Sequence, residues 1–234
     1  MNENMTPALP DVEIYTDGGC EPNPGPGGYG VVLLHPKTRQ RKEASGGFRL
    51  TTNNRMEIFA AIKGLELLNQ PCKVTLYSDS QYLVKAMTEG WVIEWKRKDW
   101  WRTNRERPEN VDLWRRLFAL CETHQVQFRW IKGHAGDAEN ERCDRLCAAA
   151  SNRPNLPVDE GYENKPETDA ERPRLTQEGQ PCWKCGTPVI KQKGRRKANR
   201  DYYFEYYLFC PKCQATYQVE EAKRLIEQPG SLFE

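Results

Sequence analysis

Four acidic residues have the types and positions that metal-assisted hydrolysis requires, namely Asp17, Glu57, Asp79 and Asp144. Carboxylates that meet in a fold repel one another, and hard divalent cations with oxygen ligands supply the counter-charge. Two Mg²⁺ ions bridged by such acids can bind both the attacking water and the leaving oxygen of a phosphodiester. Spacing alone does not show that the four residues converge, so the elements that carry them must be considered.

Asp17 follows a short apolar strand at 12–15, and a loop rich in glycine and proline separates this strand from the apolar residues 31–34. This pattern predicts a strand, a tight loop and a returning strand. The carboxylate is then held on rigid sheet while the following glycines leave space beside it. The alternative is an aspartate that only caps a turn.

Glu57 comes after a predicted strand at 40–50 and the residues Thr-Thr-Asn-Asn at 51–54, which can cap a helix that continues from residue 55. The apolar positions of this helix recur at helical spacing. Glu57 is expected in the first turn at the edge of the apolar face, pointing toward the sheet. The alternative is a favourable interaction with the helix dipole and nothing more.

Asp79 repeats the placement of Asp17, because it follows the predicted strand 73–77 and precedes a predicted helix at 81–87. In open α/β sheets, ligands bind at the carboxyl ends of the strands. A helix N-cap is the alternative role for this residue.

Tryptophans and basic residues alternate in residues 90–102. The pattern fits an amphipathic helix that buries its tryptophans, or a basic aromatic surface that binds a phosphodiester backbone. We expect Trp91 and Trp95 in the core and the basic residues exposed.

A helix at 110–123 and a strand at 125–131 lead to the loop 132–137, which contains His134, and to a helix at 139–150, which contains Asp144. Small residues around His134 favour an exposed, mobile side chain suited to proton transfer, although a lone histidine is usually structural. Cys143 and Cys147 are spaced like metal ligands on a helix, but without a partner pair we expect small core residues.

The predicted order of elements is βββαβααβα, an α/β domain over residues 10–151. The motifs TDGGCEPNPGPGGYG, TTNNRMEI, YSDSQYLV, NVDLW and KGHAGDAENERCD, in this order, resemble type 1 ribonuclease H of the bacterial kind over residues 11–150. The resemblance implies a ribonuclease H-like five-stranded mixed sheet flanked by helices. It also implies cleavage of the RNA strand of an RNA–DNA hybrid to 5′-phosphate and 3′-hydroxyl ends, with two Mg²⁺ ions, or Mn²⁺, as cofactor.

The same resemblance implies roles for individual residues. Asp17, Glu57, Asp79 and Asp144 would bind the metal ions, with His134 helping proton transfer or product release. Cys20, Asn23, Asn53, Asn54 and Gln81 would read the 2′-hydroxyls in the RNA minor groove, the group that distinguishes RNA from DNA. Thr52 and Asn110 would bind a DNA phosphate, and Trp91, Lys96 and Lys98 would belong to a basic substrate-binding handle.

Two departures from the family pattern concern substrate binding. Leu50 occupies a position where family members often have an arginine, so we expect binding of the DNA strand to be altered. An extra residue, Gly90, precedes Trp91 and is expected to shift the angle of the handle.

The last third of the chain lies outside the resemblance. Residues 152–179 are polar and predict a flexible linker. Two Cys-x-x-Cys pairs then predict a zinc-ribbon-like domain at 180–234 with structural Zn²⁺ bound by Cys182, Cys185, Cys210 and Cys213. Metal binding would supply much of its folding free energy. A pair of disulfides is the alternative, which a cytosolic location disfavours.

A basic stretch at 191–200 precedes an aromatic stretch at 201–209. The two predict either a surface that binds a nucleic-acid backbone and stacks on bases, or a solvated hairpin tip above aromatics that fill a small core. A short terminal helix is predicted at 220–227.

Length, net charge and the lack of long apolar runs limit the classes of protein that remain. The chain has 234 residues with a formal net charge of +2, too small to imply a polyanionic partner by itself. No apolar run or leader suggests a membrane or secretion, so we expect a cytoplasmic monomer. The partners expected are an RNA–DNA hybrid and a second nucleic-acid or protein contact through the zinc-ribbon-like domain. The alternatives are a nucleic-acid-binding protein with a weak or vestigial nuclease site and a nuclease acting on DNA.

Overall fold

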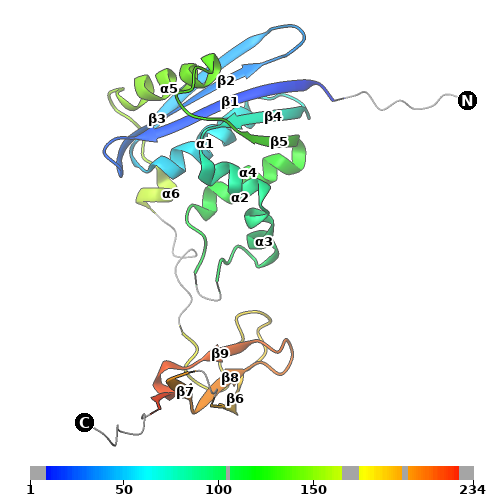
Figure 1. Ribbon diagram of the computed structural model, residues 1–234, viewed down its shortest axis with the longest axis vertical. Coiled ribbons are helices and arrows are strands. Elements are labelled where there is room, and N and C mark those ends of the chain that lie inside the picture. The colour runs from blue at the N-terminus through cyan, green and yellow to red at the C-terminus, as the bar shows by residue number, and fades with distance from the viewer. Residues whose placement is uncertain (1–8, 104–105, 165–173, 197–199, 227–234) are drawn as a thin grey trace, which may run out of the picture. The chain divides into compact units, whose positions relative to one another are not determined.

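The computed structural model describes residues 9–103, 106–164, 174–196 and 200–226 (Figure 1). These residues divide into two compact units. The first contains the described residues of 1–102 and 107–170, and the second contains those of 171–234 together with those of 103–106. Among the described residues, no helix has the length and apolar character needed to span a membrane.

The first unit is built on a five-stranded sheet with the strand order β3-β2-β1-β4-β5. β2 pairs antiparallel with both β1 and β3, whereas β4 pairs parallel with both β1 and β5, so the sheet is mixed. The predicted fold class is therefore confirmed. The strands are β1 (Asp11–Cys20), β2 (Gly25–Leu34), β3 (Arg41–Thr51), β4 (Lys73–Ser78) and β5 (Gln125–Trp130).

Helices cover both faces of this sheet, with α1 and α4 on one face and α5 on the other (Figure 1). Residues such as Ile14, Val31 and Leu76 form a continuous apolar core with α1, α2 and α4. On the other face α5 packs directly on the glycines of β2, because a Cβ at Gly30 would lie 2.1 Å from the carbonyl oxygen of Cys143. The helices are α1 (Asn53–Glu66), α2 (Gln81–Thr88), α3 (Trp91–Arg97), α4 (Val111–Thr123), α5 (Ala138–Ser151) and the short α6 (Glu160–Glu163).

Three expectations about the helices are wrong. Three helices, not two, lie between β4 and β5, because the chain turns from α2 into α3 at Gly90, whose φ of 80° suits glycine. Trp95 packs on the core as expected, but Trp91 is 37% exposed. In addition, α1 begins at Asn53 with Thr52 as N-cap, so Glu57 lies in the second turn and not in the first.

The segment that follows α5 does not behave as the predicted linker over its whole length. The amide of Arg49 on β3 donates to the carbonyl oxygen of Pro157 over 2.9 Å, and the Asp159 side chain is buried against α1. Residues up to 164 thus belong to the first unit, because polar contacts hold them there in place of apolar ones. The rest of the predicted linker, 165–173, lies outside the described residues.

The second unit has two small sheets, with the order β6-β8-β9 in one and β10-β7 in the other. The predicted helix at 220–227 is not formed as such: a 3-10 turn, η2 (Glu220–Ala222), leads into β10 (Lys223–Leu225), which pairs with β7. Residue 227 lies outside the described residues. The other strands are β6 (Ile190–Lys193), β7 (Tyr202–Phe204), β8 (Tyr206–Phe209) and β9 (Thr216–Gln218).

Candidate active site and cysteine cluster

Three of the four predicted carboxylates meet at one edge of the sheet. Asp17, Glu57 and Asp79 each place one carboxylate oxygen within 4.8 Å of the others. The parallel pairing of β1 with β4 ends at Thr16 and Ser78, so the residues after them, Asp17 and Asp79, lie at the same level. Asp79 follows β4 as predicted, but Asp17 lies within β1 and not at its end, because the glycines after it continue the strand to Cys20 by pairing with β2.

Gly18 brings the third carboxylate to the other two. A Cβ at this position would lie 2.2 Å from the backbone of Met56 and 2.4 Å from the amide nitrogen of Glu57, so only glycine lets β1 and α1 approach this closely. The Gly18 amide donates to the carboxylates of both Asp17 and Glu57, which partly offsets the rise in their pKa described below.

Asp144 lies on α5, half-buried and outside the tight group of three. Its charge nevertheless acts on Asp17, as shown by its part in raising the pKa of that residue. On the same helix, Asn140 Nδ2 donates to Asp79 Oδ2 over 3.3 Å. Sequence reasoning missed Asn140, although it is a polar residue in line with the buried Cys143 and Cys147 of α5.

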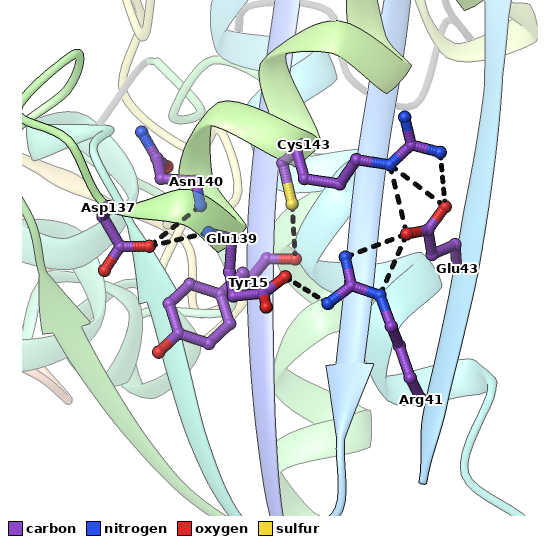
Figure 2. A network of polar contacts seen from close by, with 8 residues as sticks. Tyr15, Arg41, Glu43, Asp137, Glu139, Asn140 and Cys143 are labelled. Atoms are coloured by element: carbon purple, nitrogen blue, oxygen red, sulfur yellow. Dashed lines mark hydrogen bonds and ion pairs between the residues drawn. The ribbon is translucent and has the colours of Figure 1, made fainter. Parts of the chain in front are cut away.

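A polar network fixes α5 on the sheet (Figure 2). Asp137 caps the helix by accepting from the amides of Glu139 and Asn140, both over 3.0 Å. Figure 2 also shows Arg41 of β3 between Glu43 and Glu139, while the Cys143 thiol donates to the Tyr15 carbonyl oxygen over 3.2 Å. The helix that carries Asp144 is therefore anchored to both β1 and β3.

Cys143 and Cys147 are confirmed as buried residues in the contact between α5 and the sheet. The Cys147 thiol donates to the Gly28 carbonyl oxygen over 3.2 Å.

The carboxylate group is electrostatically unfavourable without counter-charge. Burial, followed by the charges of Asp79 and Asp144, raises the pKa of Asp17 to about 7. Complete burial, followed by the same kind of repulsion, raises the pKa of Glu57 well above its ordinary value. One oxygen of Glu57, Oε2, is buried without a hydrogen-bond partner among the described residues. An unpartnered buried oxygen among acids fits a hard cation, which prefers oxygen ligands.

His134 lies on the loop beside this group. It is exposed and has a φ of 51°, and its charge lowers the pKa of Asp17. The adjacent Gly133 leaves room for Asp79, because a Cβ there would lie 2.6 Å from Asp79 Oδ2.

A cavity of about 600 Å³ brings together half of the residues expected to bind substrate. Its lining includes Asn23, Thr52, Asn53, Asn54 and Asn110. The Cys20 amide donates to Asn53 Oδ1 over 2.7 Å, which ties the first loop to the start of α1. Gln81 is exposed at the start of α2 and does not line this cavity.

Arg55, which also lines this cavity, was not singled out from the sequence. Its side chain is only 3% exposed and is paired with Asp159 and Asp112 over 2.7 and 2.8 Å. Its Nη1 also donates to Asn110 Oδ1 over 3.5 Å. An arginine inside the motif TTNNRMEI is the only signal the sequence offers, because its partner Asp159 lies 104 positions away.

The predicted basic handle is more neutral than its sequence suggests. Lys96 pairs with Glu122 over 2.6 Å, and Lys98 pairs with Glu94 over 2.8 Å. Trp91 is exposed at the start of α3, and its ring lies 6.4 Å from that of Trp95 at an interplanar angle of 51°, so the two rings are tilted and not stacked.

The second unit contains the other cluster, in which the sulfur atoms of Cys182, Cys185, Cys210 and Cys213 all lie within 4.8 Å of one another. The closest pairs are 3.4 and 3.5 Å apart, far from the 2.05 Å of a disulfide, and all four cysteines are free. Tetrahedral Zn²⁺ with Zn–S bonds of about 2.3 Å separates its sulfurs by about 3.8 Å, so the spacing fits zinc. Hydrogen bonding with Thr187 lowers the pKa of Cys185, which favours the thiolate there. At Cys213 the Ala215 amide, which lowers the pKa, is outweighed by burial and by the neighbouring cysteines, which raise it.

Comparison with known proteins assigns the first unit. The RNase H family matches residues 10–152. A ribonuclease H of Desulforamulus reducens is 55% identical over 159 residues, which cover 68% of this chain and 99% of that protein. A ribonuclease H of Rippkaea orientalis is 60% identical over 154 residues, covering 66% of this chain and 93% of that protein.

Solved structures agree on the fold. LC9-RNase H1, described as a type 1 RNase H with the type 2 active-site motif, is 30% identical with a TM-score of 0.56, covering 62% of this chain and 74% of that one. The prototype foamy virus protease-reverse transcriptase, at 20% identity and a TM-score of 0.53, shows the fold alone and covers 63% of this chain and 21% of that one. The family match, the close relatives and the five-stranded sheet together show that this chain is a hydrolase of the RNase H family.

Proposed function

We propose that the first unit hydrolyses the RNA strand of RNA–DNA hybrids with a pair of divalent cations, leaving 5′-phosphate and 3′-hydroxyl ends. Asp17, Glu57, Asp79 and Asp144 would hold the cations, Mg²⁺ or Mn²⁺. The observation that carries the proposal is the convergence of three carboxylates, one with an unpartnered buried oxygen, in a member of the RNase H family.

Cations bound there would supply Lewis-acid stabilisation at the attacking and leaving oxygens and would lower the pKa of a bound water. The protein contributes the fixed positions of the ligands: Asp17 on β1, Glu57 on α1, and Asp79 held by Asn140. His134, which is exposed, would exchange a proton with solvent or with the departing product.

Substrate would bind in the adjoining cavity. The 2′-hydroxyls of the RNA strand would exchange hydrogen bonds with the side-chain amides of Asn23, Asn53 and Asn54 and with the backbone of Cys20. Gln81, at the start of α2, would make the same kind of contact. Thr52 and Asn110 would bind a phosphate of the DNA strand, close to the paired Arg55.

Cleavage of a labelled hybrid in Mg²⁺ tests this function. The wild type is expected to cut the RNA strand, and Asp17→Asn is expected to reduce kcat by at least a hundredfold, since one ligand is lost. Asp11→Asn, at the start of the same strand, is the matched control and should leave cleavage unchanged. Equal activity of the two variants, or no RNA cleavage by the wild type, would refute the proposal.

For the second unit we propose a structural Zn²⁺ bound by the four clustered cysteines, in a domain that adds affinity for substrate or for a partner. The sulfur spacing and the absence of disulfides among the nine cysteines support it. Metal analysis should find about one zinc per chain, lost in Cys210→Ser and retained in the control Cys121→Ser. Zinc-free protein that keeps a folded second unit would contradict it.

A further inference from the structure

Most aromatic side chains of the second unit do not fill its core. Within 202–209 only Leu208 is fully buried, and of the aromatic residues there only Tyr206 packs on the core cluster. The other rings are half-buried outside that cluster: Tyr202, Tyr203, Phe204, Tyr207 and Phe209. The hypothesis that these aromatics are core residues therefore fails, and their position needs another explanation.

Four of these rings line a cavity of about 310 Å³ formed by residues of both small sheets. Gly194 allows this arrangement, because a Cβ there would lie 1.6 Å from the carbonyl oxygen of Phe204, and the Gly194 amide donates to the Glu205 carbonyl oxygen over 2.8 Å. This cavity is here called the aromatic pocket. Its lining consists of Gly194, Arg195, Arg200, Tyr202, Tyr203, Phe204, Tyr207, Thr216 and Gln218.

Cationic side chains surround the rings of the aromatic pocket. The Arg196 guanidinium lies 4.5 Å from the Tyr203 ring centre, and Lys223 Nζ lies 4.3 Å from that of Tyr202. The Arg200 guanidinium lies 5.4 Å from the same Tyr202 ring and donates to its hydroxyl over 3.1 Å. These contacts hold the cations beside the ring faces.

The arginines at the aromatic pocket differ from those of the first unit in their charge balance. Within the described part of the chain, Arg195, Arg196 and Arg200 form no ion pair with a carboxylate, whereas Arg41, Arg55 and Arg142 each do. Of the two acids in this stretch, Asp201 forms no ion pair with these arginines among the described residues, and Glu205 is paired with Arg224 over 2.9 Å. Positive charge without an acidic partner favours an anionic ligand.

We propose that the aromatic pocket binds single-stranded nucleic acid, with unstacked bases lying on Tyr203 and its neighbouring rings and phosphates contacting Arg195 and Arg200. Aromatic faces accept any base, and adjacent cations follow the backbone. Duplex bases are already stacked on one another, so they do not offer their faces to such a pocket. DNA and RNA single strands share this chemistry.

Fluorescence anisotropy of the full-length protein with a labelled oligothymidylate tests the proposal. Tyr203→Ala is expected to weaken binding about tenfold, and Tyr203→Phe should retain it because the ring remains. The double variant Arg195→Ala/Arg200→Ala should weaken binding and lower the slope of log Kd against log salt by about 1.4, the value for two lost phosphate contacts on a single strand.

The matched control is Lys184→Ala/Lys212→Ala, which removes the same charge from exposed positions of the same unit that do not line the aromatic pocket. Its Kd should change less than twofold. Zinc content is measured in every variant to show that the second unit is folded. If Tyr203→Ala loses its metal, the variant Arg195→Ala/Arg200→Ala, which changes only exposed side chains, provides the test. Unchanged binding by the arginine variant, equal loss in the control, or an equal effect of the pocket variants on duplex DNA would overturn the proposal. Loss confined to single-stranded DNA or RNA supports it.

Discussion

The first unit has a continuous apolar core between its sheet and helices, whereas the core of the second is small and includes two of the four clustered cysteines, Cys182 and Cys210. The carboxylates of the first unit sit on elements that this core already positions. The cysteines of the second are themselves part of what holds its strands together. We therefore expect metal to complete a preformed site in one unit and to fold the other.

Loss of zinc is expected to produce the largest difference in folding stability between the two units. Zinc binding supplies on the order of 10 kcal/mol or more to a small thiolate domain, more than a core of this size can replace. In Cys182→Ser/Cys210→Ser, hydrogen exchange should become fast throughout 174–226 and stay slow in β1, β4 and α1. Cys72→Ser is the control in the first unit, and slow exchange retained in the second unit of the double variant would contradict this prediction.

The next largest effect is expected at the buried pair that ties residues 152–164 to the first unit. Asp159→Ala leaves the buried Arg55 with Asp112 as its remaining acidic partner, and we expect the free energy of unfolding to fall by about 2 kcal/mol in urea titrations. Glu163→Gln, which breaks only the exposed contact with Arg49, is the control and should change little. Equal effects would mean that the buried pair contributes no more than a surface one.

An effect of similar size but opposite sign is expected at the carboxylate group. The pKa of Asp17 is raised in the folded protein to about 7, so the folded state binds a proton more tightly than the unfolded chain. For this group, stability is greatest below its ordinary pKa of 3.8 and falls as the pH rises toward 7. Without metal, Asp17→Asn should therefore stabilise the first unit at pH 8, by about 1 to 3 kcal/mol.

Thermal melts of metal-free Asp17→Asn and wild type at pH 5 and pH 8 measure this difference. The gain should be larger at pH 8, and added Mg²⁺ should raise the melting temperature of the wild type more than that of the variant. A gain that is independent of pH would show that Asp17 is not destabilised by its neighbours.

The smallest effect is expected on the surface. Arg142→Ala removes an exposed partner of Glu43, whose pKa the hydrogen bonds from Arg142 lower to about 2. The stability lost in thermal melts should be slight and should vanish in high salt, because exposed ion pairs are weak and screened. A large loss that persists in salt would show that the network in Figure 2 anchors α5 more firmly than surface pairs do.

Periodicity explains why so much of the first unit was predictable. Strands and helices with alternating or helical apolar patterns were found within a few residues of their bounds, and the fold class is confirmed. Asp17 and Asp79 could be placed side by side because each follows the last residue that pairs in parallel between β1 and β4, although β1 itself continues to Cys20. The roles of the site residues in binding metal and substrate remain predictions.

The features that the sequence did not reveal depend on partners distant in the chain. The burial of Asp159 depends on Arg55, and no local pattern marks a polar segment that packs through one ion pair. Residues 223–225 form a strand because β7 lies beside them, although their composition suits a helix. Trp91 is exposed because α3 turns it outward, which helical spacing alone could not distinguish from burial.

The most direct test of the central claim is the kcat of Cys182→Ser/Cys210→Ser on an RNA–DNA hybrid at saturating substrate in Mg²⁺. If chemistry resides in the carboxylates of the first unit and zinc only folds the second, kcat should stay within about twofold of the wild type while KM rises. A kcat that falls together with the zinc content would contradict this account.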